Sequence, residues 1–253
     1  MATVSPPTAI AQLRRTLERM EPHAGCERGV LPFGIDAIDD RLPGGGLALG
    51  HLHEVMEGGP ASEYAGLCTL LVAGILSRLA GPVLWCLRGR DLFAPALSRV
   101  GLHPDRVIFC ETWKDSEVLP AMEEGLRCKG LAGVVGELIA LPLKASRRLQ
   151  LAAANSGVTT LAIHRWRTQS DKSRASEPNA AATRWRVSPY PSKQTDFEIM
   201  PRQQWRIELL RVRGGEPHSW IVEATDAAGY LALPAVSAER SAATAGPQRA
   251  LAG

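Results

Sequence analysis

The sequence of 253 residues lacks any long uninterrupted run of apolar side chains. No run approaches the roughly 20 apolar residues that a helix needs to cross a bilayer. The first 20 residues also contain no apolar stretch of the kind that forms the centre of a secretory signal. We therefore expect a cytoplasmic protein that does not bind a membrane.

Cysteine is sparse, and its spacing carries no motif. The five cysteines are widely separated, and no Cys-x-x-Cys pair occurs. This spacing excludes a zinc ribbon and gives no sign of a disulfide framework. We therefore expect no bound metal.

Lysine is also scarce, and the charge that is present is unevenly distributed. Arginine outnumbers lysine by 24 to 5, although biased codon usage would produce the same excess. Residues 165–213 contain 11 basic and 5 acidic side chains, a local charge of +6, whereas the whole chain carries only +3. Because arginine suits bidentate contacts with phosphate and carboxylate, the late segment is electrostatically distinct.

The middle of the chain alternates short apolar segments with longer helical patterns. The expected strands cover residues 51–56, 82–87, 106–110, 131–138 and 159–164. The expected helices cover residues 64–80, 92–100, 115–129 and 143–155. Such alternation builds βαβ units, so we predict an α/β fold with a mostly parallel central sheet flanked by helices.

Three segments complete the predicted organisation. Residues 1–27 contain an amphipathic helix, which packs on the chain's own core or on a partner through Ile10, Leu13, Leu17 and Met20. Residues 28–233 form the main domain, with an irregular basic segment at 166–204 and a C-terminal antiparallel hairpin around Gly214-Gly215. Residues 234–253, rich in Ala and Ser, are expected to form a flexible tail.

An ordered set of short motifs resembles the RecA ATPase core. The set comprises GIDAID (34–39), PGGGL (43–47), EVMEGGP (54–60), LSRVGL (97–102) and RVIF (106–109). The pattern extends over about residues 28–230, most of the chain. The resemblance implies a RecA-like core, in which the loop after the first long strand binds the phosphates of ATP.

The candidate phosphate loop departs from the pattern G-x-x-x-x-G-K-[ST]. In that pattern backbone N–H groups surround the phosphates and the lysine contacts the β- and γ-oxygens. Gly59 opens the loop, but Tyr64, Ala65 and Gly66 stand where Gly, Lys and Ser or Thr are needed. The first lysine of the chain is Lys114. The candidate cofactor-binding residues are therefore only those of a degenerate loop, Gly58, Gly59, Pro60 and Ser62.

The other nucleotide-binding positions also depart from the RecA pattern. After the second strand, no glutamate occurs before Glu111 to orient an attacking water. Gly136 stands where an aspartate would help to hold Mg²⁺, and strand alternation predicts that Glu137 faces the other way. We therefore expect a protein without efficient ATP hydrolysis and without a required cofactor. Weak ATP binding by the helix N-terminus remains open.

This combination of a RecA-like core, eroded nucleotide motifs and a basic late segment resembles the bacterial ImuA family of damage-inducible mutagenesis proteins. The resemblance implies a non-catalytic accessory role in SOS-type mutagenesis and translesion synthesis. It implies three partners: an ImuB-like Y-family polymerase homologue, an error-prone replicative-type DNA polymerase, and RecA. Two alternatives remain open, a SulA-like inhibitor of cell division that binds FtsZ and an ATP-binding recombinase-type ATPase.

Arginine and tryptophan alternate in the late segment and form the candidate contacts with single-stranded DNA or a partner. These residues are Arg165, Trp166, Arg167, Arg184, Trp185, Arg186, Trp205 and Arg206. Arginine neutralises phosphate, and tryptophan stacks on unpaired bases at about 1–3 kcal/mol per base. The same alternation is typical of a half-buried strand whose tryptophans pack inward, so both interpretations remain open. His164, at a strand end, is either a ligand sensor or a strand cap.

Overall fold

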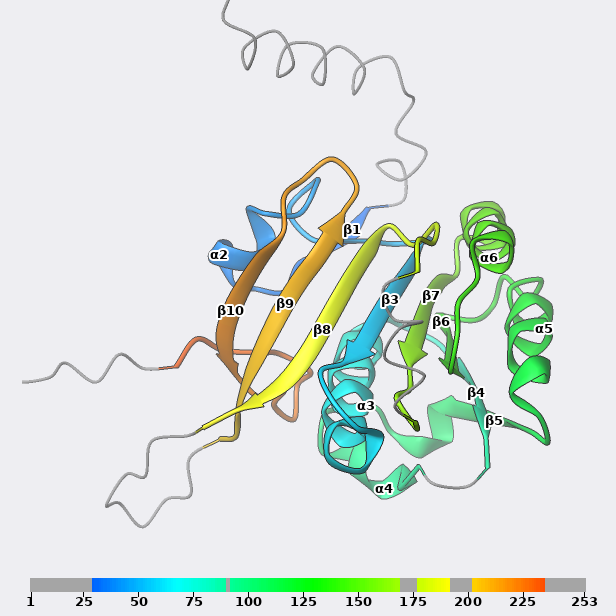
Figure 1. Cartoon of the computed structure of the whole chain (residues 1–253), viewed down its shortest axis with the longest axis horizontal. Coiled ribbons are helices and arrows are strands. Elements are labelled where there is room, and N and C mark those ends of the chain that lie inside the picture. Colours follow the sequence, from blue (N-terminus) through cyan, green and yellow to red (C-terminus); the bar gives the residue numbers. More distant parts are fainter. Residues whose placement is uncertain (1–28, 90–91, 169–176, 192–201, 235–253) are drawn as a thin grey trace, which may run out of the picture.

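The computed structural model describes residues 29–89, 92–168, 177–191 and 202–234 (Figure 1). The strands are β1 (Val30–Leu31), β2 (Leu47–Ala48), β3 (Leu52–Glu57), β4 (Val83–Arg88), β5 (Val107–Thr112), β6 (Gly133–Leu138), β7 (Thr159–His164), β8 (Thr183–Tyr190), β9 (Gln204–Val212) and β10 (His218–Glu223). The helices are α2 (Asp36–Asp39), α3 (Ala61–Ser77), α4 (Ala94–Ser98), α5 (Asp115–Gly125) and α6 (Leu143–Ser156). Each strand and helix predicted between residues 51 and 164 is present close to its predicted bounds.

Eight strands form one sheet in the order β10-β9-β8-β3-β7-β6-β4-β5 (Figure 1). The six strands from β8 to β5 are parallel, whereas β9 and β10 are antiparallel. Strands β1 and β2 form a separate antiparallel pair. The fold class is as predicted: α/β, mostly parallel, with a C-terminal antiparallel hairpin, consistent with a RecA-like core.

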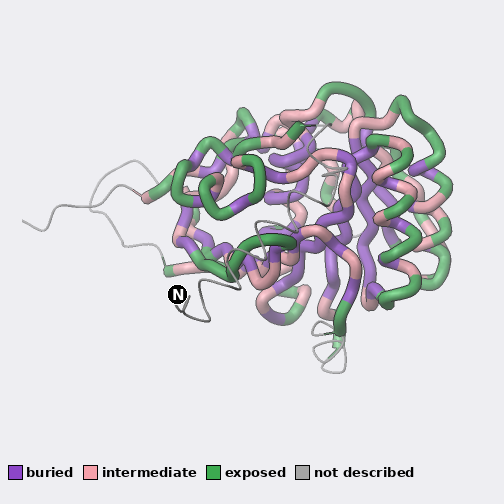
Figure 2. The backbone as a smooth tube through the Cα atoms, turned by 90° about the horizontal axis from the view of Figure 1, so that it is seen from above, coloured by how far each residue is buried: buried purple, intermediate pink, exposed green. Residues whose placement is uncertain are grey.

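Helices cover both faces of the parallel part of the sheet. Helices α3 and α4 pack together on one face, and α5 and α6 pack together on the other. Each face has its own apolar cluster, with Leu71 and Trp85 on the α3 side and Met122 and Leu149 on the α5 side. In Figure 2 the strands are buried between helices whose outer turns are exposed. This two-sided burial explains why β4, β6 and β7 consist mainly of apolar residues.

The three C-terminal strands extend the sheet beyond α3, and the N-terminal segment packs against them. The ring of Trp185 lies 5.3 Å from that of Phe33 and 6.3 Å from that of Trp220. The indole N–H of Trp220 donates to the carbonyl oxygen of Ala37 at 3.0 Å. Among the described elements, no helix covers the opposite face of these three strands (Figure 1).

Two helix ends have clear causes in the sequence. Helix α6 ends at Gly157, whose φ of 82° lies in the left-handed region that glycine adopts without strain. The guanidinium of Arg106 donates to the carbonyl oxygens of Ser77 at 3.1 Å and Gly81 at 2.9 Å. This arginine therefore satisfies carbonyls at the C-terminus of α3, which the helix itself leaves unpaired.

Some predictions concern residues outside the described ranges. The predicted helix with Ile10, Leu13, Leu17 and Met20 lies there, as do residues 235–253 of the predicted tail. The basic segment 166–204 is described only in part, and that part contains all of β8. Within the described ranges, no helix combines the length and apolar character required to cross a membrane.

Candidate functional site

A three-residue loop, residues 58–60, joins the carboxyl end of β3 to α3. Ligands of parallel α/β sheets bind beyond the carboxyl ends of the strands, so this loop is the candidate nucleotide site. Two backbone donors at the loop are already used: the Gly58 N–H donates to the carbonyl of Val187 at 2.9 Å, and the Ala61 N–H at the start of α3 donates to the carbonyl of Trp166 at 2.8 Å. These two N–H groups are therefore not directed at a phosphate.

Side chains of α3 fill the space around the loop. A Cβ atom at Gly59 would lie 2.5 Å from the ring of Tyr64, so the tyrosine packs directly over the loop backbone. Pro60 has no N–H to offer, and Ser62 lies exposed in the first turn of α3. The predicted loop residues thus lie together at the end of β3, with the ring of Tyr64 packed against Gly59.

Substitution of Gly58 tests how tightly the loop is held. A Cβ atom at this position would lie 2.9 Å from the carbonyl oxygen of Val187 and would also overlap Ser188. We expect Gly58→Ala to lower the free energy of unfolding by about 1–3 kcal/mol, the usual cost of overpacking. The matched control is Gly66→Ala in α3, where the added Cβ meets nothing within 4 Å.

The control should stabilise the protein by about 0.5–1 kcal/mol, because alanine is the better helix former. Urea unfolding of both variants and the unsubstituted protein gives the comparison. Equal stability of Gly58→Ala and the unsubstituted protein would contradict the close contact between the loop and β8.

Arg165 lies beneath this loop, immediately after β7, and is only 6% exposed. Its Nε donates to Glu137 at 2.9 Å and its Nη1 donates to Glu57 at 2.8 Å. Two further hydrogen bonds, to the carbonyl of Ala65 at 3.0 Å and to Thr69 Oγ1 at 2.9 Å, connect the guanidinium to α3. Arg165 therefore joins the carboxyl ends of β3 and β6 to the first turns of α3.

Electrostatics keep this arginine charged. Burial opposes the charged form, but the carboxylates of Glu137 and Glu57 outweigh that effect, so the pKa of Arg165 is raised. One arginine and two glutamates give the cluster a formal charge of −1. The remaining carboxylate oxygens accept hydrogen bonds from the Trp85 indole N–H at 2.9 Å and the Trp166 backbone N–H at 2.7 Å. We call Glu57, Glu137 and Arg165 the buried triad.

The position of Glu137 corrects one prediction. Successive residues of β6 alternate as expected, but it is Gly136 that faces α5, where a Cβ would collide with Met122. Glu137 faces α3 and the loop, not away from them, because its carboxylate meets Arg165 and Trp85. The only carboxylate of β6 thus lies on the side of the candidate nucleotide site, where Arg165 is already its partner.

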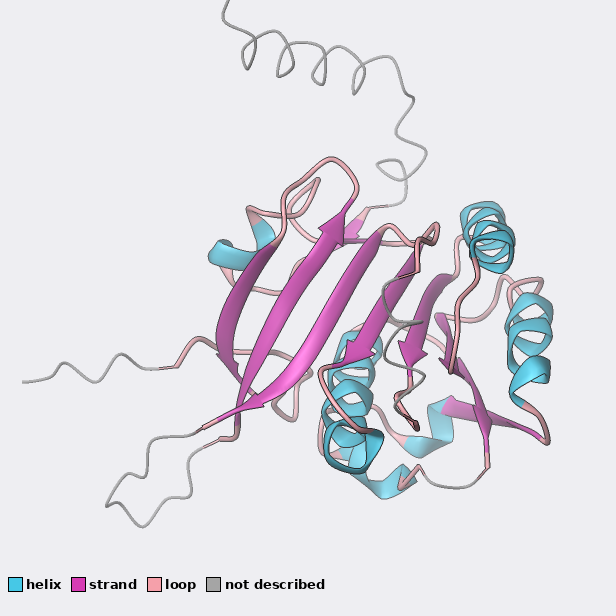
Figure 3. Ribbon diagram, in the orientation of Figure 1, coloured by secondary structure: helices cyan, strands magenta, loops and turns pink. Residues whose placement is uncertain are grey.

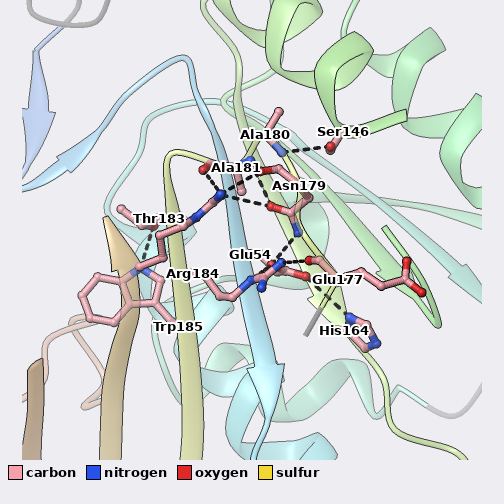
Figure 4. Close-up of polar contacts among 11 residues, drawn as sticks. Glu54, Ser146, His164, Glu177, Asn179, Ala180, Ala181, Thr183, Arg184 and Trp185 are labelled. Carbon is pink, nitrogen blue, oxygen red and sulfur yellow. Dashed lines mark hydrogen bonds and ion pairs between the residues drawn. The ribbon is translucent and has the colours of Figure 1, made fainter. Parts of the chain in front are cut away.

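A third buried carboxylate, that of Glu54, belongs to a separate polar cluster (Figure 4). Glu54 is 1% exposed and accepts hydrogen bonds from Arg184 Nε at 2.5 Å and Asn179 Nδ2 at 2.8 Å. His164 Nδ1 lies 3.5 Å from its other oxygen, a close electrostatic contact without hydrogen-bond geometry. Burial raises the pKa of Glu54, but the contacts with His164, Arg184 and Asn179 prevail, so its pKa is lowered.

The Glu54 cluster anchors the segment that leads into β8. Arg211 donates to the carbonyl oxygens of Asn179 at 2.8 Å and Ala181 at 2.6 Å, and the Ala180 N–H donates to Ser146 of α6 at 2.9 Å. The described part of the basic segment is therefore held to the sheet and to α6 by its polar groups. Among the described residues, no three His, Cys, Asp or Glu side chains are placed to hold a metal.

The structure separates the predicted contact residues into interior and surface groups. Trp185 and Trp205 are 3% and 0% exposed and belong to the core on the α3 side. Neither ring can stack on a base without leaving that core. Arg165 is buried in the triad and Trp166 is half-buried, whereas Arg167 is exposed, with Nη1 3.9 Å from Asp115. Trp185 and Trp205 therefore pack inward, as expected for a half-buried strand.

Arg184 is bound in the Glu54 cluster, whereas Arg186 and Arg206 lie on the open face of β8 and β9. Arg186 forms two hydrogen bonds of 2.6 Å with Glu208, and the guanidinium of Arg206 lies 5.5 Å from the ring centre of Tyr190. A shallow hollow of about 540 Å³ opens here, lined by Gly58, Arg186, Ser188, Tyr190, Arg206 and Glu208 among others. Sequence reasoning missed Tyr190, although it shares a strand face with Arg186.

Similarity to known proteins extends over most of the chain. No family model matches it. Protein ImuA of Caulobacter vibrioides, from strain NA1000 / CB15N and from strain ATCC 19089, is 38% identical over 216 residues. The similarity covers 82% of this chain and 88% of the Caulobacter protein, so it extends well beyond any single motif.

Proposed function

The chain belongs to the ImuA family, and from this membership we propose that the protein is a non-catalytic accessory factor of damage-induced mutagenesis. It acts in the cytoplasm during SOS-type translesion synthesis and does not copy DNA itself. The observation that carries the non-catalytic part of the proposal is the buried triad, which binds Arg165 to Glu57 and Glu137 next to the loop.

Electrostatics support the absence of ATP turnover. Phosphoryl transfer requires cations that neutralise the charge developing on the phosphate oxygens. In this chain the arginine beneath the loop is bound by two carboxylates, which leaves a surplus negative charge. Like charges 4 Å apart repel by about 4 kcal/mol at an effective dielectric constant near 20. A triphosphate at this place is therefore opposed by the same groups that stabilise the fold.

The proposed partners are those of the family: an ImuB-like Y-family polymerase homologue, an error-prone replicative-type DNA polymerase, and RecA. A RecA-like core without nucleotide turnover presents a constant surface, which suits a docking platform. The open face of β8 and β9 is a candidate surface, because Arg186, Arg206 and Tyr190 combine cations with an aromatic ring. Arginine and tyrosine are enriched where interfaces derive most of their energy. For single-stranded DNA, Arg167, Arg206 and Tyr190 replace the core tryptophans as candidate contacts.

Two measurements test the proposal. We expect the purified full-length protein to hydrolyse ATP no faster than a buffer control, because the Gly58 and Ala61 N–H groups and the nearby Arg165 already have partners within the protein. We expect deletion of the gene to reduce ultraviolet-induced mutation to the level of a strain that lacks the ImuB-like partner. Complementation with the unsubstituted gene is the control.

The contrary outcomes point to the alternative functions. Turnover well above background that disappears in Gly59→Ala would establish an ATPase of the recombinase type. Direct FtsZ binding, with cell filamentation on overexpression and unchanged induced mutation, would establish a SulA-like inhibitor of division.

A further inference from the structure

Cys86 and Cys110 face each other across the two outermost strands of the parallel sheet. They are direct partners in the register of β4 and β5, and their side chains are in hydrogen-bond contact. Neighbouring strands lie about 4.7–4.9 Å apart, which falls within the Cα separation of about 4.4–6.8 Å that disulfides require. We propose that Cys86 and Cys110 form a thiol pair that hydroperoxides oxidise to a reversible intramolecular disulfide.

The two thiols differ in accessibility and therefore in role. Cys86 is completely buried on the α5 side of the sheet, whereas Cys110 is partly exposed, because β5 is the edge strand. Burial, together with the smaller effect of the neighbouring Cys110, raises the pKa of the Cys86 thiol to about 12. Since the thiolate is the reactive form, Cys110 reacts with the oxidant and Cys86 follows as the resolving thiol.

The reaction proceeds in two balanced steps. The Cys110 sulfur attacks one oxygen of the hydroperoxide, the O–O bond breaks, and the products are a sulfenic acid and water or an alcohol. The sulfur loses two electrons and the peroxide gains them. The Cys86 sulfur then attacks the Cys110 sulfur, the S–O bond breaks, and water leaves with the thiol proton. A dithiol reductant reverses the process by thiol–disulfide exchange.

The geometry favours a bond that is easily reduced. A disulfide needs its Cβ atoms about 3.5–4.5 Å apart, slightly closer than the strand spacing, so the bond must draw β5 toward β4. Strained disulfides are the labile ones, and in reducing compartments disulfides are usually transient. The other described cysteines have no such arrangement: Cys68 is buried in α3, and Cys128 is exposed after α5. The inference does not depend on the proposed function.

Peptide mapping of the full-length protein tests the pair directly. Trypsin releases Cys86 within Leu79–Arg88 and Cys110 within Val107–Lys114, each peptide carrying a single cysteine. After treatment with hydrogen peroxide and alkylation of free thiols in denaturant, we expect a linked peptide two hydrogens lighter than the two peptides combined. Dithiothreitol should restore both peptides, and Cys110→Ser should abolish the linked species.

Oxidation of Cys128 in the same digest shows that the oxidant was active. A Cys26→Ser/Cys128→Ser variant should still form the link, which excludes exchange through either of these two thiols. The proposal is overturned if both peptides are recovered separately alkylated while Cys128 is oxidised. It is equally overturned if Cys110 is recovered as sulfinic acid with Cys86 still free.

Discussion

Replacing Arg165 with alanine should lower the free energy of unfolding by about 3–5 kcal/mol, the cost of removing one partner from a buried ion pair. The substitution leaves Glu57 and Glu137 as buried carboxylates without their common cation. It also removes the hydrogen bonds that join β7 to the start of α3. Because most domains are stable by only about 5–15 kcal/mol, such a loss is a large fraction of the total.

Chemical denaturation of the purified variant measures this effect, with Arg167→Ala as the matched control. Arg167 lies two residues further along but is exposed, so its replacement should change stability by less than about 0.5 kcal/mol. A second variant separates charge from packing: Arg165→Met combined with Glu57→Gln and Glu137→Gln removes all three charges. It should be more stable than Arg165→Ala. Equal stability of Arg165→Ala and Arg167→Ala would exclude a structural role for the triad.

Replacing Glu54 with glutamine should cost about 3–5 kcal/mol at neutral pH, because it leaves the largely buried guanidinium of Arg184 without a counter-charge. The pKa of Glu54 is lowered in the folded protein. Its contribution to stability is therefore complete above the ordinary glutamate pKa of 4.5. It is lost as pH falls below that value through the folded pKa. The difference between variant and unsubstituted protein should shrink correspondingly below pH 4.5.

Urea unfolding at pH 7, pH 5 and pH 3.5 measures this difference in unfolding free energy between Glu54→Gln and the unsubstituted protein. The control is Glu208→Gln, which removes a similar Glu–Arg pair between β9 and β8 at a more exposed position. Exposed ion pairs contribute less than about 1 kcal/mol. Glu208→Gln should therefore lower the free energy of unfolding by less than Glu54→Gln at pH 7 and pH 5. A stability difference for Glu54→Gln that stays constant down to pH 3.5 would show that the carboxylate charge is not what Arg184 requires.

The sheet was predictable because its strands are short apolar runs between helical patterns, and burial on both faces demands such runs. Helices α5 and α6 could be predicted from the local spacing of their apolar residues alone. The Arg-Trp-Arg segments were ambiguous, because one alternation suits both a nucleic-acid surface and a half-buried strand. The packing of Trp185 against Phe33 decides between them, and that contact joins residues far apart in the sequence.

The buried triad was beyond sequence reasoning for the same physical reason. Arg165 begins an Arg-Trp-Arg triplet, a pattern that also suits an exposed nucleic-acid surface. Its partners Glu57 and Glu137 lie 108 and 28 residues away in the sequence. One signal was available: Glu54 and Glu57 stand in a short expected strand with Leu52, Val55 and Met56. A charge buried in such a strand must have a partner. The sequence contains many arginines, so the pattern predicts that partners exist without identifying them.

The position of β3 has a consequence for how the chain is synthesised. This first long strand pairs only with β7 and β8. Leu52 is paired with Thr160 and His53 with Thr183, so neither pairing can form until those later residues have been synthesised. At about 5–20 residues per second, a ribosome needs roughly 5–20 s to deliver the intervening hundred residues. During that interval β3, with its two glutamates, has no strand partner on either side. We therefore expect β3 to be covered mainly by α3 until the last third of the chain has left the ribosome.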